Sequence, residues 1–348
     1  MKKSLITGVT GQDGYYLSRY LLSKGHKVYG LKRRNSLINA TARIDSLLLN
    51  KFFIILQGDM SDPFFLNDVI CKYKVDYIFN LAAMSHVKTS FDIPEYTTDV
   101  NALGTLRILE AIRVNNLKKI RFYQASSSEI FGNSSKKFQN ERTEIAPASP
   151  YAASKAYAYW ITKIYRESYG IFASNGILFN HESPYRGETF VTRKIVRAAV
   201  QIVQNKQKNL ILGNLDAKRD WGHADDYCRA MHKIITYKNP DDFVISSGNT
   251  MSVRQFTKIV FQKLGIELIF KFKGYKEIGY INNVKKELNH LSKNKILIKV
   301  SKKYFRPTDV NYLKGDFTKA NRLLKWKPTI TLNKLIDEMI DSELNHYE

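Results

Sequence analysis

Residues 7–14 read Thr7-Gly8-Val9-Thr10-Gly11-Gln12-Asp13-Gly14, between a short apolar run and a segment with apolar residues at helical spacing. Glycines at this spacing let the chain turn tightly and let a pyrophosphate approach backbone N–H groups at a helix N-terminus. A glycine triplet alone is common, but one that follows the first strand of a βαβ series indicates a dinucleotide site. The predicted cofactor contacts here are Gly8, Thr10, Gly11, Gln12, Asp13 and Gly14.

The first 180 residues alternate between strand-like and helix-like segments. Apolar runs predict strands at residues 3–7, 26–31, 53–58, 75–82, 120–125 and 174–179. Helical spacing predicts helices at residues 12–24, 63–73, 102–115 and 152–169. Strands that alternate with helices predict an α/β fold with a Rossmann-type, doubly wound parallel sheet. Ligands of such a sheet bind beyond the carboxyl ends of its strands.

The pattern loosens beyond about residue 180. Helices are predicted at residues 192–204, 253–264, 318–324 and 333–344, with one further strand at residues 243–247. This mixture predicts two domains: residues 1–180 form the sheet domain, and residues 181–348 form a smaller, mixed α/β lobe. We expect some segments of the lobe to return to the sheet.

Composition excludes several classes of protein. Of 348 residues, 44% are hydrophobic and 12% are aromatic, which is typical of a chain with a large folded core. No apolar run approaches the roughly 18 residues of a membrane span, and the N-terminus turns polar too early for a signal peptide. The two cysteines, Cys71 and Cys228, form no CxxC pair. We therefore expect no disulfide framework, no metal site, no membrane partner and a cytoplasmic location.

The charge admits three interpretations. Lysine and arginine number 55 against 32 acidic residues, a formal net charge of +23. The chain could bind nucleic acid, bind small anionic nucleotides, or carry a solvated coat of lysines. Residues 271–303 hold ten lysines and two acidic residues, and there we favour a solvated surface. Because no nucleic-acid motif occurs, small anionic ligands plus a lysine coat explain the charge best.

The end of the second predicted strand bears on the choice of dinucleotide. NAD sites place an Asp or Glu about 20 residues beyond the glycines, where it grips the ribose 2′-hydroxyl. This chain has Lys32-Arg33-Arg34-Asn35-Ser36 instead. Guanidinium groups suit a 2′-phosphate, so NADP is preferred over NAD, although an ordinary basic loop is the alternative. The predicted contacts are Arg33, Arg34, Asn35 and Ser36.

Two further strand ends are consistent with a dinucleotide. Asp59-Met60 follows the third predicted strand, where a carboxylate could accept a bond from the adenine amino group. Leu81-Ala82-Ala83 ends the fourth, and small side chains there would let a cofactor lie across the backbone.

A catalytic signal occurs at Tyr151-Ala152-Ala153-Ser154-Lys155. The i, i+4 spacing places Tyr151 and Lys155 on one face of a helix. A nearby ammonium lowers the pKa of a phenol, so the tyrosine can act as a base. The fifth predicted strand leads into Ser126-Ser127-Ser128-Glu129, where a hydroxyl can face the same substrate oxygen. A surface Tyr–Lys pair is the alternative, but Ser, Tyr and Lys on a dinucleotide fold imply hydride transfer at a sugar carbinol.

Longer motifs carry a resemblance to a known family. They lie at residues 7–14, 32–34, 123–129, 149–151, 157–160, 175–184, 186–194, 219–223 and 304–309. The last two motifs read Arg219-Asp220-Trp221-Gly222-His223 and Tyr304-Phe305-Arg306-Pro307-Thr308-Asp309. In these motifs the chain resembles the extended short-chain dehydrogenases/reductases, of the NAD-dependent epimerase/dehydratase family, and within them the GDP-mannose 4,6-dehydratases.

The resemblance implies a catalytic set and a redox-neutral reaction. The family's catalytic positions fall on Ser127, Glu129, Tyr151 and Lys155. Tyr151 would remove the O4 proton of GDP-mannose while hydride leaves C4 for NADP⁺. Glu129 would then take the C5 proton and help expel the C6 hydroxyl as water. Return of the hydride to C6 would give a GDP-4-keto-6-deoxy sugar.

The same resemblance implies the binding residues and the assembly. The cofactor set gains Ser85, Tyr96, Tyr151, Lys155, His181 and Arg186. The implied substrate contacts are Ser85, Ser127, Glu129, Asn180, Val191, Arg193, Lys194, Arg219, Arg306 and Asp309. Residues 1–180 would be the NADP-binding domain and residues 181–348 mainly the nucleotide-sugar lobe. Family members often associate through the loop after the second strand, so residues 34–43 would contact a second subunit in a homodimer or homotetramer.

The chain departs from the family pattern at four positions. Ser127 stands where Thr is usual, Met84 for Gln, Tyr185 for Arg and Asp309 for Glu. Ser keeps the hydroxyl, whereas Met84 removes an amide and Tyr185 removes a charge. We therefore keep two alternatives open: a 4,6-dehydratase of another GDP-sugar such as a manno-heptose, and a non-catalytic NADP-binding regulator.

Overall fold

The larger domain is built on a seven-stranded sheet. The computed structural model describes residues 1–34, 41–134, 136–305 and 308–345. The strand order is β10-β6-β5-β4-β1-β2-β3, and every pairing is parallel. The strands are β1 (Lys3–Thr7), β2 (Lys27–Lys32), β3 (Phe53–Gln57), β4 (Tyr77–Asn80), β5 (Arg121–Ser127), β6 (Phe172–Leu178) and β10 (Asp242–Ile245). The Rossmann-type fold predicted from the sequence is confirmed.

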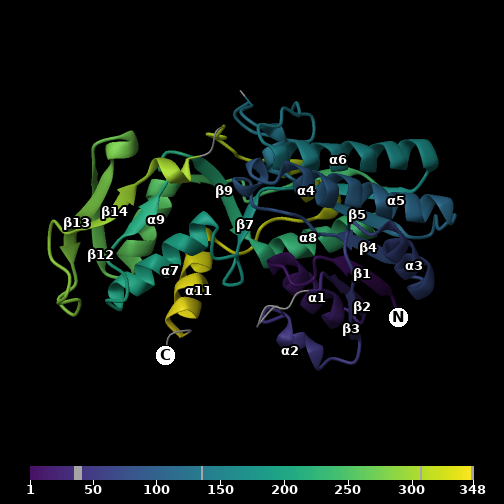
Figure 1. Cartoon of the computed structure of the whole chain (residues 1–348), viewed down its shortest axis with the longest axis horizontal. Helices are drawn as coiled ribbons and strands as arrows, with labels where there is room; N and C mark the ends of the chain where they lie inside the picture. Colours follow the sequence, from purple (N-terminus) through teal and green to yellow (C-terminus); the bar gives the residue numbers. More distant parts are fainter. Residues whose placement is uncertain (35–40, 135, 306–307, 346–348) are drawn as a thin grey trace.

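Helices cover both faces of this sheet (Figure 1). One face carries α1 (Gln12–Ser23) and α8 (Ala224–Thr236), which pack on each other. The other carries α3 (Pro63–Tyr73), α4 (Pro94–Thr98), α5 (Gly104–Val114) and α6 (Pro150–Tyr169), while the short α2 (Asp45–Leu48) lies near β3. Strands that are covered on both faces are apolar throughout, which explains the buried runs in β1 and β2.

The order of strands opens a crevice next to β1. The chain moves from β1 to β2 and β3 on one side, and from β4 to β5 and β6 on the other. A reversal of this kind is the ligand site of doubly wound sheets. Gly8 has φ 68° at this point, and a Cβ on it would lie 2.8 Å from Cα of Ala82 in the segment after β4. The first turn therefore needs glycine because the two backbone segments touch.

Helix α6 presents its first turn to the same crevice. Ser149 caps the helix by accepting a bond from the Ala152 N–H, and Pro150 fills the first helical position, where no N–H is needed. Gly170 ends the helix with φ 63°. Tyr151 and Lys155 are both buried on the side of α6 that faces the sheet. Local capping signals thus fix the start of the helix that carries the predicted catalytic pair.

The smaller lobe holds two further sheets. One has the order β11-β9-β7 and the other β12-β13-β14-β8. Their strands are β7 (Asn180–Glu182), β8 (Leu210–Leu212), β9 (Lys218–His223), β11 (Thr250–Ser252), β12 (Ile266–Lys271), β13 (Ile278–Val284) and β14 (Ile296–Val300). The core between them is closed by α7 (Val191–Val203), α9 (Val253–Lys263) and α11 (Leu332–Asn345). Figure 1 shows β12, β13 and β14 at the end of the molecule away from α3 and α5.

The second half of the chain also contributes to the main sheet. β10 pairs with β6 at its edge, α8 packs on β5 and β6, and α10 (Thr318–Leu324) contacts β10 and α8. Among the described residues, no helix is long and apolar enough to cross a membrane.

The sequence analysis missed several elements of this half. Helix α8 and strands β7, β8, β9 and β11 to β14 were not predicted, and β13 and β14 lie inside the lysine-rich segment 271–303. Nine of its ten lysines are exposed, but Ile281, Leu297 and Ile298 are fully buried. The composition of the segment is dominated by lysine, so it does not reveal the few apolar residues that form a buried face on these strands.

The glycine-rich turn generates a stability prediction. A Cβ on Gly14 would lie 2.3 Å from the carbonyl oxygen of Val9, so the backbone would have to shift. We expect Gly14→Ala to lower the free energy of unfolding by about 3 kcal/mol, measured by urea denaturation. Gly170→Ala is the control, because it has open space and only a positive φ, and should cost about 1 kcal/mol. Equal losses in the two variants would contradict the close approach.

Candidate active site

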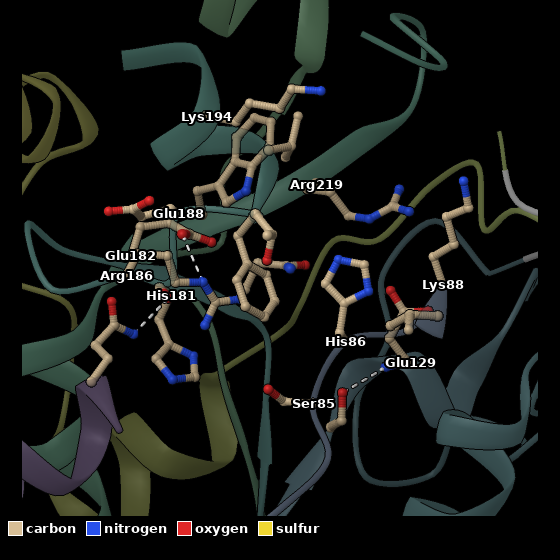
Figure 2. A pocket seen from close by; sticks show the side chains of 18 of the residues that line it. Ser85, His86, Lys88, Glu129, His181, Glu182, Arg186, Glu188, Lys194 and Arg219 are labelled. Atoms are coloured by element: carbon tan, nitrogen blue, oxygen red, sulfur yellow. Dashed lines mark hydrogen bonds and ion pairs between the residues drawn. The ribbon is translucent and has the colours of Figure 1, made fainter. Parts of the chain in front are cut away.

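One large cavity lies between the carboxyl ends of the main strands and the smaller lobe (Figure 2). Its volume is about 1170 Å³. The predicted residues that line it are Gly8, Thr10, Gly11, Gln12, Asp13, Gly14, Leu81, Ala82, Ala83, Ser85, Ser127, Glu129, Tyr151, Lys155, Asn180, His181, Arg186, Val191, Lys194, Arg219 and Asp309. Residues that are far apart in the sequence thus meet around a single space.

A buried hydrogen-bond network shapes the wall of this cavity. The Thr7 hydroxyl accepts bonds from the Leu81 and Ala82 N–H groups, each at 3.0 Å, and donates to Asn80 Oδ1 at 2.7 Å. Asn80 Nδ2 in turn donates to Gln124 Oε1 at 2.7 Å. The network therefore ties β1, β4 and β5 together at the ends that face the cavity.

The glycine-rich loop and α1 are joined to β7 by polar contacts. Gln12 Nε2 donates to the His181 carbonyl at 3.1 Å, and the Ser183 hydroxyl donates to Gln12 Oε1 at 2.7 Å. His181 Nε2 lies 2.8 Å from Asp13 Oδ2. These bonds fix the smaller lobe against the loop that would hold a pyrophosphate.

Three of the residues predicted to bind the adenosine part of the dinucleotide lie at a second, smaller cavity. It is lined by Arg33, Arg34 and Asp59, together with Gln57 and Gly58. The Arg33 guanidinium contacts the hydroxyl of Tyr96. The predicted contacts Asn35 and Ser36 lie outside the described residues.

Met60, which was predicted with Asp59, lines neither cavity. Its side chain is buried and faces Gly104, and its carbonyl accepts a bond from Arg107 at 3.0 Å. Met60 therefore supports α5 rather than presenting its side chain to a ligand.

The Tyr–Lys pair lies at the floor of the large cavity. Lys155 Nζ donates to the Ala125 carbonyl at 2.9 Å, and burial lowers the pKa of Lys155 to about 8. Burial raises the pKa of Tyr151 to about 12, while a hydrogen bond with Ser127 acts in the opposite direction. The hydroxyl of Ser127 and the phenol of Tyr151 are thus close enough to bond to each other.

Glu129 brings a carboxyl group to the same cavity. It follows β5, and its N–H lies 3.3 Å from the Ser127 hydroxyl. Only 7% of its surface is exposed. Figure 2 shows its side chain on the side of the cavity that also carries His86 and Lys88. A carboxyl group beside a Ser–Tyr–Lys set is what an elimination step needs in addition to a hydride-transfer site.

Cationic side chains gather around the rest of the cavity. Arg186 pairs with Glu182 at 3.0 Å and stacks on Phe190 at 3.8 Å from the ring centre. Lys194 Nζ lies 3.5 Å from the centre of the Tyr304 ring. Arg219, almost fully buried, lies 3.5 Å from Asp309. Such cations favour an anionic ligand.

Buried polar atoms in the wall also fit a polar ligand. Asn180 Oδ1, Ser126 Oγ and Trp221 Nε1 are buried, line the cavity and have no hydrogen-bond partner among the described residues. Buried polar atoms are normally paired, so these three suit a ligand that can bond to them. Among the described residues, no group of three or more His, Cys, Asp or Glu could hold a metal ion.

One predicted substrate contact stands apart from the cavity. Arg193 does not line it, because its guanidinium forms a buried ion pair with Glu343 of α11 at 2.7 Å. Arg306 lies outside the described residues. Asp220, the residue after Arg219, accepts bonds from the Ser247, Gly248 and Gly315 N–H groups.

Several lining residues were not predicted. They are Arg43, His86, Lys88, Glu182, Glu188, Arg197 and Gln201. His86 follows Ser85 directly. Its position next to a predicted contact could have indicated that it also lines the cavity. The others come from loops, from the last residue of β7 (Glu182) and from α7, where no spacing rule indicates which side chains turn inward.

The fold and the site define a class of protein: a Rossmann-type enzyme with a Tyr–Lys pair at a dinucleotide site and a cationic lobe beyond it. A family model described as GDP-mannose 4,6 dehydratase matches residues 5–339. The chain belongs to the GDP-mannose 4,6-dehydratase family.

Individual relatives agree with this assignment. The chain is 49% identical to a GDP-mannose 4,6-dehydratase of Yersinia enterocolitica, over 99% of this chain and 94% of the relative. It is 45% identical to the human GDP-mannose 4,6 dehydratase, over 98% and 91%. A crystal structure of dTDP-glucose 4,6-dehydratase from Bacillus anthracis in complex with NAD superposes with a TM-score of 0.78, at 21% identity over 98% of this chain and 96% of that one. That structure supports the fold.

Lys194 offers a chemical test of the cavity. Burial and the charge of Lys88 lower its pKa to about 8, so near pH 8 a large fraction of its amine is free. An ordinary lysine has a pKa of about 10.4 and is almost fully protonated there. We expect an N-hydroxysuccinimide ester to acetylate Lys194 about tenfold faster than exposed Lys51 at pH 8, measured by peptide mass spectrometry. Lys88→Met should slow the reaction, and rates equal to Lys51 would contradict this environment.

Proposed function

We propose that this chain converts GDP-mannose to GDP-4-keto-6-deoxymannose with loss of water, using NADP as a bound cofactor that is regenerated in each cycle. The observation that carries the proposal is the carboxyl group of Glu129 in the same cavity as Ser127, Tyr151 and Lys155. A dehydrogenase or an epimerase of this fold needs the hydroxyl, phenol and ammonium groups but has no step that requires a carboxyl group. A dehydratase has one.

The residues of the chain fit a dinucleotide. The glycine-rich loop, the small residues after β4 and the His181–Arg186 segment line one continuous wall. A nicotinamide cofactor held there would supply a reversible hydride acceptor for the sugar. Arg33 and Arg34 at the smaller cavity support NADP over NAD, because two guanidinium groups match a 2′-phosphate better than a hydroxyl.

Residues of α6 and β5 transfer the proton at O4 of the sugar. Tyr151 takes the O4 proton, and a positive charge on Lys155, on the same face of α6, would oppose the rise in the Tyr151 pKa that burial causes. Lys155 is oriented by its bond to the Ala125 carbonyl. Ser127 donates to the same sugar oxygen and helps to hold it.

Glu129 performs the elimination. With a ketone at C4, the hydrogen on C5 becomes acidic, and a carboxylate close to it can remove it. The protonated carboxyl then donates its proton to the departing C6 hydroxyl, which leaves as water. When hydride returns to C6, C5 takes up a proton, which balances the one that Tyr151 removed from O4. One residue can serve both steps because C5 and C6 are adjacent atoms on the sugar.

The nucleotide end of the substrate meets the cations of the smaller lobe. Arg219 and Lys194 suit the diphosphate of a GDP-sugar through charge-assisted bonds. Asn180 is the first residue of β7. It lines the cavity, and its side-chain oxygen is a buried acceptor without a partner among the described residues. We therefore place the sugar between Glu129 and Asn180, with the diphosphate pointing into the smaller lobe.

The structure weakens the argument for a different GDP-sugar. Met84 and Tyr185 do not line the large cavity. The backbone of Met84 is bonded to Asn101, and the ring of Tyr185 packs on Tyr15 at 4.4 Å between centres. Two of the four departures from the family pattern therefore do not reach the sugar, and GDP-mannose is preferred to a manno-heptose derivative.

We expect the enzyme to be a homodimer or homotetramer. Helix α6 exposes Tyr157, Trp160 and Ile164 at helical spacing, and Leu103 is exposed just before α5, which packs beside it. An apolar stripe of this kind is typical of a helix-to-helix interface. Most of the loop that was predicted to contact a second subunit, residues 34–43, lies outside the described residues.

The role of Glu129 generates a first test. Glu129→Gln should bind NADP as the unaltered enzyme does, yet lose water elimination by at least about a hundredfold, because an amide cannot accept the C5 proton. Product formation from GDP-mannose is followed by mass spectrometry, with exposed Glu144→Gln as the control. Full water loss in the Glu129→Gln variant would remove Glu129 from the mechanism.

The choice of cofactor generates a second test. The double variant Arg33→Ala, Arg34→Ala should lower the affinity for NADP by about tenfold or more, because each lost charge-assisted bond is worth about 1.5 kcal/mol or more, while NAD affinity changes little. Binding is measured by fluorescence or calorimetry, with Arg113→Ala on α5 as the matched control. An unchanged ratio of the two affinities would show that the 2′-phosphate is read elsewhere.

A further inference from the structure

A buried histidine beside the glycine-rich loop has an oxygen atom at each ring nitrogen. His181 Nδ1 lies 2.7 Å from the Phe179 carbonyl, and His181 Nε2 lies 2.8 Å from Asp13 Oδ2. A carbonyl oxygen only accepts, and so does an ionised carboxylate. Both ring nitrogens must therefore donate, which requires the doubly protonated, positively charged imidazolium.

The charges around the ring agree with this assignment. Asp13 is the acidic group in contact with the ring, and Arg186 is the nearby group that opposes its charge. Burial disfavours an isolated cation, but the Asp13 carboxylate outweighs it, and the pKa of His181 is raised. The pKa of Asp13 is lowered by the same contact, despite burial.

Neighbouring side chains hold the pair in place. The ring of Tyr227 on α8 stacks on His181 at 4.5 Å between centres. Gln12 Nε2 lies 3.2 Å from Asp13 Oδ1 and also donates to the His181 carbonyl. The ion pair thus joins the first turn of α1 to β7, two elements that come from opposite halves of the chain.

We propose that Asp13 is a positioning residue that keeps His181 as a fixed imidazolium at the dinucleotide end of the cavity. Both side chains line the cavity together with Gly8 and Gly11. A dinucleotide is anionic at its pyrophosphate, which the glycine-rich loop would hold. Asp13 therefore acts on the cofactor through His181: it fixes the direction of the ring and stabilises its charged form.

The inference rests on the proposed dinucleotide site, and the two can fail separately. The protonation state of His181 is measured on the full chain without cofactor, so it does not depend on binding. If the unaltered protein binds neither NADP nor NAD, the proposed function fails whatever the histidine does.

The first experiment follows the histidine signals by NMR. The seven histidines are labelled at Cε1, and His181 is assigned from the signal that disappears in His181→Asn. We expect the His181 signal of the unaltered protein to titrate above the ordinary histidine value of about 6.5 and to report a charged ring at pH 7. In Asp13→Asn it should titrate at or below the ordinary value of about 6.5, because the carboxylate is gone and burial remains. A His181 that is neutral at pH 7 in the unaltered protein would overturn the proposal.

The second experiment measures NADP affinity against pH. Asp13→Asn should weaken binding at pH 7.5 on the order of tenfold, with part of the loss recovered at pH 5.5 as His181 regains its proton. The control is Asp242→Asn, which removes a buried carboxylate paired with Arg166 at the far edge of the sheet. That variant should lose stability but keep the pH profile of the unaltered protein. An Asp13→Asn protein whose affinity equals that of the unaltered protein, or whose loss is the same at both pH values, would show a merely structural role.

Discussion

The arrangement of the site depends on a row of buried hydrogen bonds that crosses three strands of the sheet. Thr7, Asn80 and Gln124 lie opposite one another on β1, β4 and β5, and their side chains are bonded in sequence. Because unpaired polar groups in a core are costly, these bonds specify one register of the strands. The same register brings the glycine-rich turn, the small residues after β4 and the Ser127–Glu129 segment to one edge. Lys155 joins this edge through the Ala125 carbonyl.

The charge of the chain has two different origins. Inside the cavity, Lys155, Arg186, Lys194 and Arg219 are buried or partly buried, held by specific partners, and face the space where anionic ligands would bind. In the segment 271–303 the lysines are mostly exposed and lie mainly in the loops that connect and follow β12, β13 and β14. The first group lies where a low dielectric constant strengthens its attraction to an anionic ligand. The charges of the second group are screened by solvent. A net charge of +23 therefore describes a nucleotide site and a solvated coat, not one continuous basic surface.

The sequence predicted the parts of the fold and site that local chemistry specifies. The strand and helix of residues 3–24 follow from glycine spacing, and α6 follows from the Ser149–Pro150 cap and the ending at Gly170. In the smaller lobe, β13 was missed because only alternate residues are buried, and β9 because its buried residues are mostly polar. Arg193 could not be placed either, since its direction is set by Glu343 in the distant helix α11. The Asp13–His181 contact joins residues 168 positions apart and has no local signal.

In the proposed mechanism, the carboxyl group of Glu129 adds the elimination of water to a site that otherwise only transfers hydride. The most direct test supplies GDP-mannose that carries deuterium at C4 and determines the product by mass spectrometry and NMR. The account predicts loss of one water and transfer of the deuterium to C6 of the same sugar, without net consumption of NADP. A product that retains its oxygen at C6, or one whose deuterium is lost to solvent, would contradict it.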